Sequence, residues 1–128
     1  MATPRSRLIA IVDDDESVRE ALKSLMRSVG FSVETFASAE DFLQADCLSA
    51  TACLLLDLRL PGISGLELQR QLGAARRRVP IIFVTAHGNE SQQREALERG
   101  AIDFLRKPFR EEALLDAVQS ALRRSADG

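Results

Sequence analysis

Tryptophan and tyrosine are both absent from this 128-residue chain, and only two cysteines and one histidine are present. Two cysteines without metal-ligating partners at a useful spacing form neither a zinc site nor a disulfide framework. We therefore expect Cys47 and Cys53 to be reduced thiols of a cytoplasmic protein. Cys53 lies inside an apolar run, which favours a small buried hydrophobic residue over a functional thiol.

Long hydrophobic runs and a strong net charge are also absent. No apolar run approaches the length of a membrane-spanning helix, and the run at residues 8–12 is too short for a signal peptide. The net charge of −2 provides no global basic field for holding a nucleic acid. We expect a single domain over residues 1–128, with its core at about 7–123 and short tails at both ends. We expect it to contact neither nucleic acid nor membrane.

Acidic residues follow two of the short apolar runs. Three aspartates, residues 13–15, come directly after the run 8–12, and Asp57 comes directly after the run 53–56. Such runs, cut off by polar residues, predict buried strands of a parallel sheet, and ligands of open α/β sheets bind where these strands end. Carboxylates packed there repel one another, and a hard cation bound by oxygens would relieve the repulsion. The pattern therefore indicates a Mg²⁺ site with an acidic nucleophile.

Strand and helix patterns alternate five times along the chain, with no internal repeat or linker. The expected strands are residues 8–12, 32–36, 52–57, 81–85 and 102–106. The expected helices are 16–29, one that starts at 38, 64 to about 73, 90–99, and 111 to about 123. Asp15 is expected to cap the start of the first helix. Gly30 is expected to adopt a left-handed conformation at the end of that helix.

This alternation predicts an α/β fold, a doubly wound five-stranded parallel sheet with helices on two faces. The common strand order for five strands is 2-1-3-4-5, which places the topological switch point between the first and third strands. Those strands end at Asp13-Asp14 and at Asp57. Thr85 and Lys107 close the fourth and fifth strands, so all five side chains are expected at one edge of the sheet.

Four segments carry a resemblance to a known family, and they are IVDDDESVREAL, LLLDLRLPGISGLEL, PIIFVTAHG and GAIDFLRKPF. In order and spacing they resemble the receiver domain of two-component response regulators over nearly the whole chain. Within that family the chain resembles the FixJ-like receivers, which are usually followed by a helix-turn-helix DNA-binding domain. The resemblance implies the flavodoxin-like receiver fold.

The resemblance also implies roles for the acidic residues. Asp57 corresponds to the phosphoryl acceptor. Asp13 and Asp14 correspond to the metal-binding acids, with Asp14 a direct ligand and Asp13 acting partly through water. The backbone carbonyl of Arg59 would complete the protein's share of the Mg²⁺ coordination.

Four further positions acquire roles in the same way. Thr85 and Lys107 correspond to the residues that contact the phosphoryl oxygens, and Phe104 corresponds to the aromatic switch. Pro108 follows Lys107, and in the family that peptide bond is cis. A cis bond before proline is uncommon and usually has a positional reason, which here would be to direct the Lys107 ammonium into the site.

As a receiver, the chain would take a phosphoryl group from a sensor histidine kinase with Mg²⁺ as cofactor. It would then change the face formed by its fourth helix, fifth strand and fifth helix, with phosphorylation-dependent homodimerisation as one outcome. The chain is either a stand-alone receiver or the N-terminal part of a transcription factor, and the resemblance favours the second.

Several residues have alternative readings. The Arg59 side chain either shields the phosphoryl group or lies in solvent, and the two readings are evenly balanced. His87, in the loop after the fourth strand, is expected to be solvated rather than a ligand. Residues 76–78, three consecutive arginines, are expected to form a solvated loop on the edge opposite the acids.

Two rival functions share this fold class. A flavodoxin-like electron carrier would need a Ser/Thr/Gly-rich loop for the flavin phosphate where residues 13–15 would repel it. A Mg²⁺-dependent phosphatase with an aspartyl nucleophile would need an acid two residues after Asp57, where Arg59 stands and cannot deprotonate. We therefore expect a phosphoacceptor, not an enzyme that turns over phosphate esters.

Overall fold

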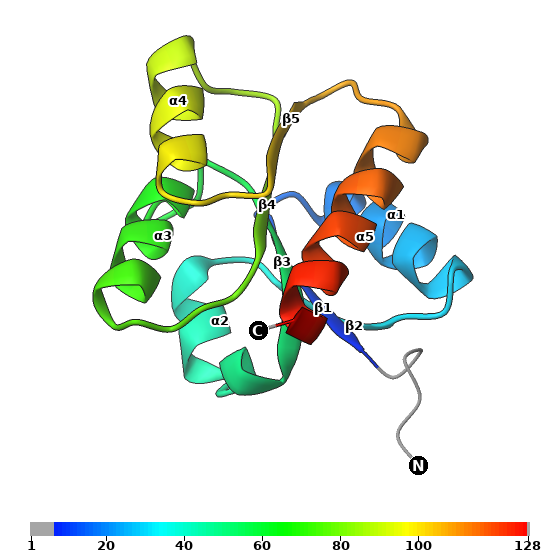
Figure 1. The fold of residues 1–128 in the computed structure, drawn as a ribbon. Coiled ribbons are helices and arrows are strands. Elements are labelled where there is room, and N and C mark those ends of the chain that lie inside the picture. Colours follow the sequence, from blue (N-terminus) through cyan, green and yellow to red (C-terminus); the bar gives the residue numbers. More distant parts are fainter. Residues whose placement is uncertain (1–6, 128) are drawn as a thin grey trace.

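The computed structural model describes the backbone of residues 7–127 and the side chains of residues 7–124, and it contains one parallel sheet (Figure 1). The five strands are β1 (Leu8–Val12), β2 (Ser32–Phe36), β3 (Thr51–Leu56), β4 (Ile81–Thr85) and β5 (Asp103–Arg106). Their order across the sheet is β2-β1-β3-β4-β5, which confirms the predicted doubly wound topology.

Helices cover both faces of the sheet (Figure 1). They are α1 (Glu16–Ser28), α2 (Ala39–Gln44), α3 (Gly65–Ala74), α4 (Glu90–Glu98) and α5 (Glu111–Asp127), with a short 3₁₀ helix, η2 (Leu48–Ala50), before β3. Helices α1 and α5 lie on one face, and α2, α3 and α4 lie on the other. The sequence patterns did not predict η2.

Alternate residues of the central strands point to the two faces and build two separate cores. In β1, Ile9 and Ile11 pack under α1 and α5, whereas Ala10 and Val12 pack under α2 and α3. All four side chains are completely buried. Burial on both faces is why these strands are continuous apolar runs and not alternating ones.

Side-chain caps begin the helices largely where the sequence indicated. The Asp15 carboxylate accepts hydrogen bonds from the backbone N–H groups of Ser17 and Val18 at 2.9 and 3.4 Å, which confirms the predicted cap. Gly30 has φ of +98° just beyond α1, as expected for a left-handed helix end. A reciprocal capping box between Asn89 and Gln92 begins α4 and was not predicted.

Element boundaries differ from the predictions by a few residues. Strand β3 begins one residue early, at Thr51, and β5 begins one residue late, at Asp103. Helix α3 continues to Ala74 with Gly73 inside it, and α5 extends four residues beyond the predicted end at Arg123.

Both cysteines are free, and burial raises the pKa of the Cys53 thiol to about 12, as suits a structural residue. Within the described part of the chain, none of the helices is both apolar enough and long enough to cross a bilayer.

Candidate functional site

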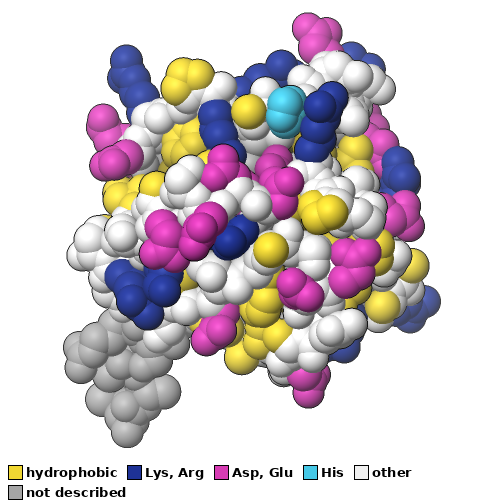
Figure 2. All heavy atoms as spheres, turned by 180° about the vertical axis from the view of Figure 1, so that it is seen from behind, with side chains coloured by type: hydrophobic (Ala, Val, Ile, Leu, Met, Phe, Trp, Pro, Cys, Tyr) yellow, Lys and Arg dark blue, Asp and Glu magenta, His cyan; other side chains and the backbone are white. Residues whose placement is uncertain are grey.

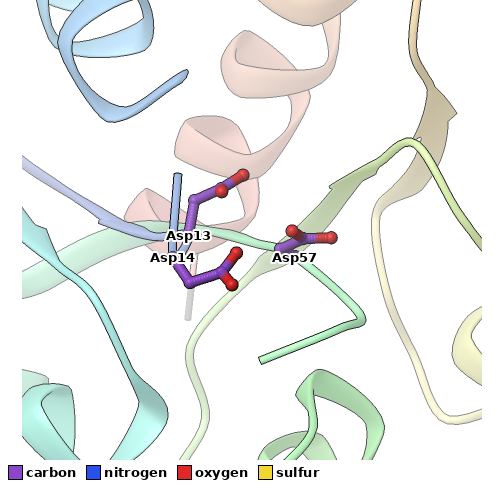
Figure 3. A group of neighbouring side chains, drawn as sticks. All are labelled: Asp13, Asp14 and Asp57. Atoms are coloured by element: carbon purple, nitrogen blue, oxygen red, sulfur yellow. The ribbon is translucent and has the colours of Figure 1, made fainter. Parts of the chain in front are cut away.

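Asp13, Asp14 and Asp57 meet at the ends of two neighbouring strands (Figure 3). Val12 of β1 pairs with Leu56 of β3, so the residues that follow them leave the sheet side by side. The backbone N–H of Asp57 donates to the Val12 carbonyl at 3.0 Å, which extends the pairing one step further. One carboxylate oxygen from each aspartate lies within 4.8 Å of the others.

The Asp13 carboxylate is held between opposing electrostatic influences. Its Oδ1 accepts a hydrogen bond from the Asp15 backbone N–H at 2.9 Å, and its Oδ2 lies 3.2 Å from the ammonium of Lys107. Burial raises the pKa of Asp13 above 3.8 and the neighbouring Asp57 carboxylate adds to this, outweighing the hydrogen bond and Lys107. Ionisation of Asp13 is therefore less favourable in the folded protein than in an aspartate exposed to water.

Asp57 has one buried oxygen, Oδ1, for which the described protein provides no hydrogen-bond partner. The residue is 7% exposed, whereas Asp14 beside it is exposed. A buried carboxylate oxygen without a partner is costly unless something else satisfies it. The cluster is thus a set of hard oxygen donors, one of them unsatisfied, with an opening on the Asp14 side.

Helix α3 begins directly against the backbone of Asp57. The N–H of Gly65 donates to the Leu58 carbonyl at 2.9 Å, and a Cβ built on Gly65 would overlap the Asp57 carbonyl oxygen. Only glycine fits there, so the start of α3 is packed tightly under the acidic residue.

Strands β4 and β5 bring Thr85 and Lys107 to the same edge. The backbone N–H of Lys107 donates to the Thr85 carbonyl at 2.8 Å, and the Lys107 side chain reaches Asp13. The Thr85 hydroxyl is buried and accepts a hydrogen bond from the backbone N–H of His87 at 3.0 Å. The Lys107–Pro108 peptide bond is cis, as the resemblance implied.

Phe104 on β5 is buried beneath the loop between β4 and α4. Its ring packs on Phe83 with the centroids 5.8 Å apart, and the guanidinium carbon of Arg106 lies 5.8 Å from its ring centroid. Gly88 closes the loop over it, since a Cβ on Gly88 would lie 3.0 Å from Phe104 Cζ and 2.6 Å from Leu58 Cδ1. The ring therefore occupies a core position in this structure.

Three sequence features remain outside the cluster. The side chains of Arg59 and His87 are exposed, and residues 76–78 lie in an exposed loop after α3. Charged side chains of both signs are interspersed on the face shown in Figure 2. Two of the three arginines, Arg77 and Arg78, line a pocket of about 480 Å³. This pocket lies at the edge of the sheet opposite to the aspartate cluster.

The sequence reasoning missed two residues that support the site. Arg19 on α1 donates a hydrogen bond to the Asp13 carbonyl at 2.8 Å, and Glu40 on α2 accepts one from the Ile63 backbone N–H at 3.0 Å. Gly62, in the loop between β3 and α3, was the available signal for Glu40, because glycine often marks a close approach of other atoms to the backbone. That signal does not name the approaching residue.

Comparisons with known proteins agree with this geometry. The family model for the response regulator receiver domain matches residues 9–119. The response regulator protein TodT of Pseudomonas putida is 50% identical over 119 residues, covering 93% of this chain and 52% of that protein.

Solved structures are similar over the same region. The response regulator StyR is 50% identical with a TM-score of 0.87, covering 94% of this chain and 61% of that one. FixJ-N is 37% identical with a TM-score of 0.81, covering 92% and 94%. The chain spans about half the length of curated relatives such as TodT.

Proposed function

Because the chain belongs to the receiver domains of two-component response regulators, with FixJ among its relatives, we propose that Asp57 accepts a phosphoryl group from a phosphohistidine of a sensor kinase. One observation carries the assignment. Asp57 has a buried carboxylate oxygen with no hydrogen-bond partner among the described residues, and one of its carboxylate oxygens lies within 4.8 Å of one from each of Asp13 and Asp14, where Lys107 reaches Asp13.

The chemistry is an in-line displacement at phosphorus. A carboxylate oxygen of Asp57 forms a new P–O bond as the P–N bond to the imidazole breaks, and the electron pair of that bond stays on the imidazole nitrogen. The product is an acyl phosphate. The Lys107 ammonium, already at the cluster, would balance charge on the phosphoryl oxygens, and Thr85 would donate its hydroxyl proton to one of them.

The donor set fits Mg²⁺, which prefers hard oxygen ligands. Asp14 and Asp57 would hold the ion directly, Asp13 partly through water, and the Arg59 backbone carbonyl would complete the protein's share. When bound, Mg²⁺ supplies neutralisation of charge on the reacting oxygens. The raised pKa of Asp13 supports a site that is incomplete without a cation.

We propose that phosphorylation changes the surface of α4, β5 and α5 through Thr85 and Phe104, that this surface supports homodimerisation, and that transcription is controlled through a DNA-binding domain in the longer protein. The regulators that this chain resembles, at about half their length, support that proposal. A cytoplasmic location is consistent with two free cysteines.

The test is phosphorylation by acetyl phosphate with Mg²⁺, followed by intact mass. The wild-type protein should gain one phosphoryl group, Asp57→Asn should gain none, and Asp116→Asn on the exposed side of α5 should behave as wild type. A hydroxylamine-labile phosphoryl group on Asp57→Asn at the normal rate would contradict the assignment. Continued release of phosphate from a phosphomonoester would instead favour the phosphatase alternative, which the exposed Arg59 argues against.

A further inference from the structure

Glu40, on the first turn of α2, reaches the loop that joins β3 to α3. Its Oε2 accepts a hydrogen bond from the backbone N–H of Ile63 at 3.0 Å, across 23 residues of sequence. Its Oε1 is buried and has no hydrogen-bond partner in the described protein. The Glu40 carboxylate is therefore partly removed from water where it binds the Ile63 N–H. A hydrogen bond to a charged acceptor of this kind is among the stronger ones in proteins.

The loop is shaped to receive that carboxylate. Gly62 has φ of +72°, a conformation that other residues rarely adopt, and a Cβ on Gly62 would overlap Glu40 Oε2 and lie 3.0 Å from Glu40 Cδ. The Glu40 side chain thus occupies the space that a side chain at position 62 would need. Glu40 and Gly62 form a complementary pair.

Helix α2 provides a fixed base for Glu40. The two buried residues of the helix, Ala39 and Phe42, are 0% and 1% exposed, and the Phe42 ring packs edge-on against Phe36 of β2 with the centroids 5.5 Å apart. The core of the domain therefore fixes the helix backbone from which the Glu40 side chain extends.

The loop between Asp57 and Ser64 is consequently held at two points. At its base, Leu58 is buried and its carbonyl accepts the Gly65 N–H, and at its far side Ile63 is bound to Glu40. Arg59 lies between these two points, and its own side chain is exposed. The backbone segment that carries the Arg59 carbonyl therefore has one fixed contact on each side.

We propose that Glu40 is a positioning residue for the phosphoryl-transfer site, holding the β3–α3 loop so that the Arg59 carbonyl and the Asp57 carboxylate face the same cation. This inference rests on the proposed function. Glu40 touches neither the cation nor the phosphoryl group, and it acts by fixing the backbone that does. A simpler role, favourable interaction of an acid with the dipole of α2, would be shared by exposed Asp41 in the same turn.

The experiment measures Mg²⁺ affinity by isothermal titration calorimetry, well below the unfolding temperature of each variant. Outer residues that orient metal ligands commonly change affinity by about tenfold or more, and we expect Glu40→Ala to weaken Mg²⁺ binding by about fivefold to tenfold. Glu40→Gln keeps an oxygen acceptor for Ile63 and should stay within about twofold of wild type. Asp41→Ala and Asp41→Asn are the matched controls and should leave the affinity unchanged.

Gly62→Ala tests the same contact with Glu40 left in place, and it serves also if Glu40→Ala does not fold. The added methyl group should displace the Glu40 carboxylate and so weaken Mg²⁺ binding. The Ile63 amide proton should move upfield in Glu40→Ala, reporting the lost hydrogen bond directly.

The outcomes separate the inference from the function on which it rests. Wild-type protein that binds no Mg²⁺ would overturn the proposed cation site. Wild-type protein that binds Mg²⁺, together with equal affinity in Glu40→Ala or in Gly62→Ala, would overturn the role of Glu40 alone. Equal weakening by Glu40→Ala and Asp41→Ala would assign the effect to helix charge and would also overturn it.

Discussion

The Thr85 hydroxyl accepts a hydrogen bond from the backbone N–H of His87 at 3.0 Å, so it is tied to the loop that covers Phe104. Because a hydroxyl can accept and donate at once, its proton remains available to an acceptor on the Asp57 side. Movement of Thr85 toward a phosphoryl oxygen would pull on this loop through His87. We propose that this pair would link a charge at Asp57 to the packing around the Phe104 ring.

We predict that Thr85→Ala accepts a phosphoryl group at Asp57 but loses most of the conformational response. In wild-type protein, beryllofluoride as a phosphoryl mimic should strengthen self-association by about tenfold, within the usual range of coupling between sites. In Thr85→Ala the change should be under about twofold, because no hydroxyl connects the two sites. Dissociation constants from analytical ultracentrifugation measure this. Thr85→Ser retains the hydroxyl and is the control, and equal strengthening in wild type and Thr85→Ala would refute the link.

Mg²⁺ should raise the melting temperature of the protein, since it binds the folded cluster and not the unfolded chain. At a free concentration ten times the dissociation constant, the expected stabilisation is about 1.4 kcal/mol. Asp14→Ala should abolish this dependence, and it should stabilise the metal-free protein by removing one of three neighbouring carboxylates. Thermal scans with Mg²⁺, and with KCl at equal ionic strength as control, test both statements. An unchanged melting temperature in millimolar Mg²⁺ would mean that the carboxylates do not form a cation site.

Strand order and the meeting of the acids could be predicted because each rests on a local pattern. Apolar runs ending at Asp13 and Asp57 identify buried parallel strands, and the doubly wound order then makes those strands neighbours. Phe104 was expected to be core in one conformation, and it is buried here. The helix ends were harder to locate, because Gly73, which suggested an end to α3, is accommodated inside that helix.

The supporting contacts could not be predicted, because they depend on side-chain reach between elements distant in sequence. Glu40 and Ile63 are 23 residues apart, and nothing in the residues around Glu40 distinguishes it from Asp41 beside it. Arg19 reads as an ordinary charged residue of α1 until its contact with the Asp13 carbonyl is seen. Sequence patterns identified the residues that carry the chemistry of the site. They did not identify residues such as Glu40 and Arg19, which matter only because the fold brings them against the backbone of the site.

The capping box at the start of α4 should contribute measurably to stability. Asn89 Oδ1 accepts the Gln92 backbone N–H at 2.8 Å, and Gln92 Oε1 accepts the Asn89 N–H at 3.0 Å. Asn89→Ala should lower the free energy of unfolding by about 1 kcal/mol, the usual cost of losing a cap. Asn89→Ser can still cap and should cost much less. Urea denaturation measures both, and equal losses would show that the cap itself contributes nothing.

Without divalent cations, the contribution of Asp13 to stability should fall as the pH rises through the titration of this residue. The pKa of Asp13 is raised above 3.8 in the folded state, chiefly by burial and then by Asp57, so the folded protein binds this proton more tightly than the unfolded chain does. That advantage is fully present below pH 3.8 and is lost as the pH passes the raised value. Asp13→Asn keeps an oxygen for the Asp15 N–H but cannot ionise. In EDTA the melting temperature of Asp13→Asn should therefore match wild type in acid and exceed it at neutral pH, with Asp116→Asn as the control for general charge. Addition of Mg²⁺ should reverse the advantage of the variant.

If the melting temperatures of wild type and Asp13→Asn change equally with pH between acid and neutral conditions, burial does not disfavour the Asp13 carboxylate.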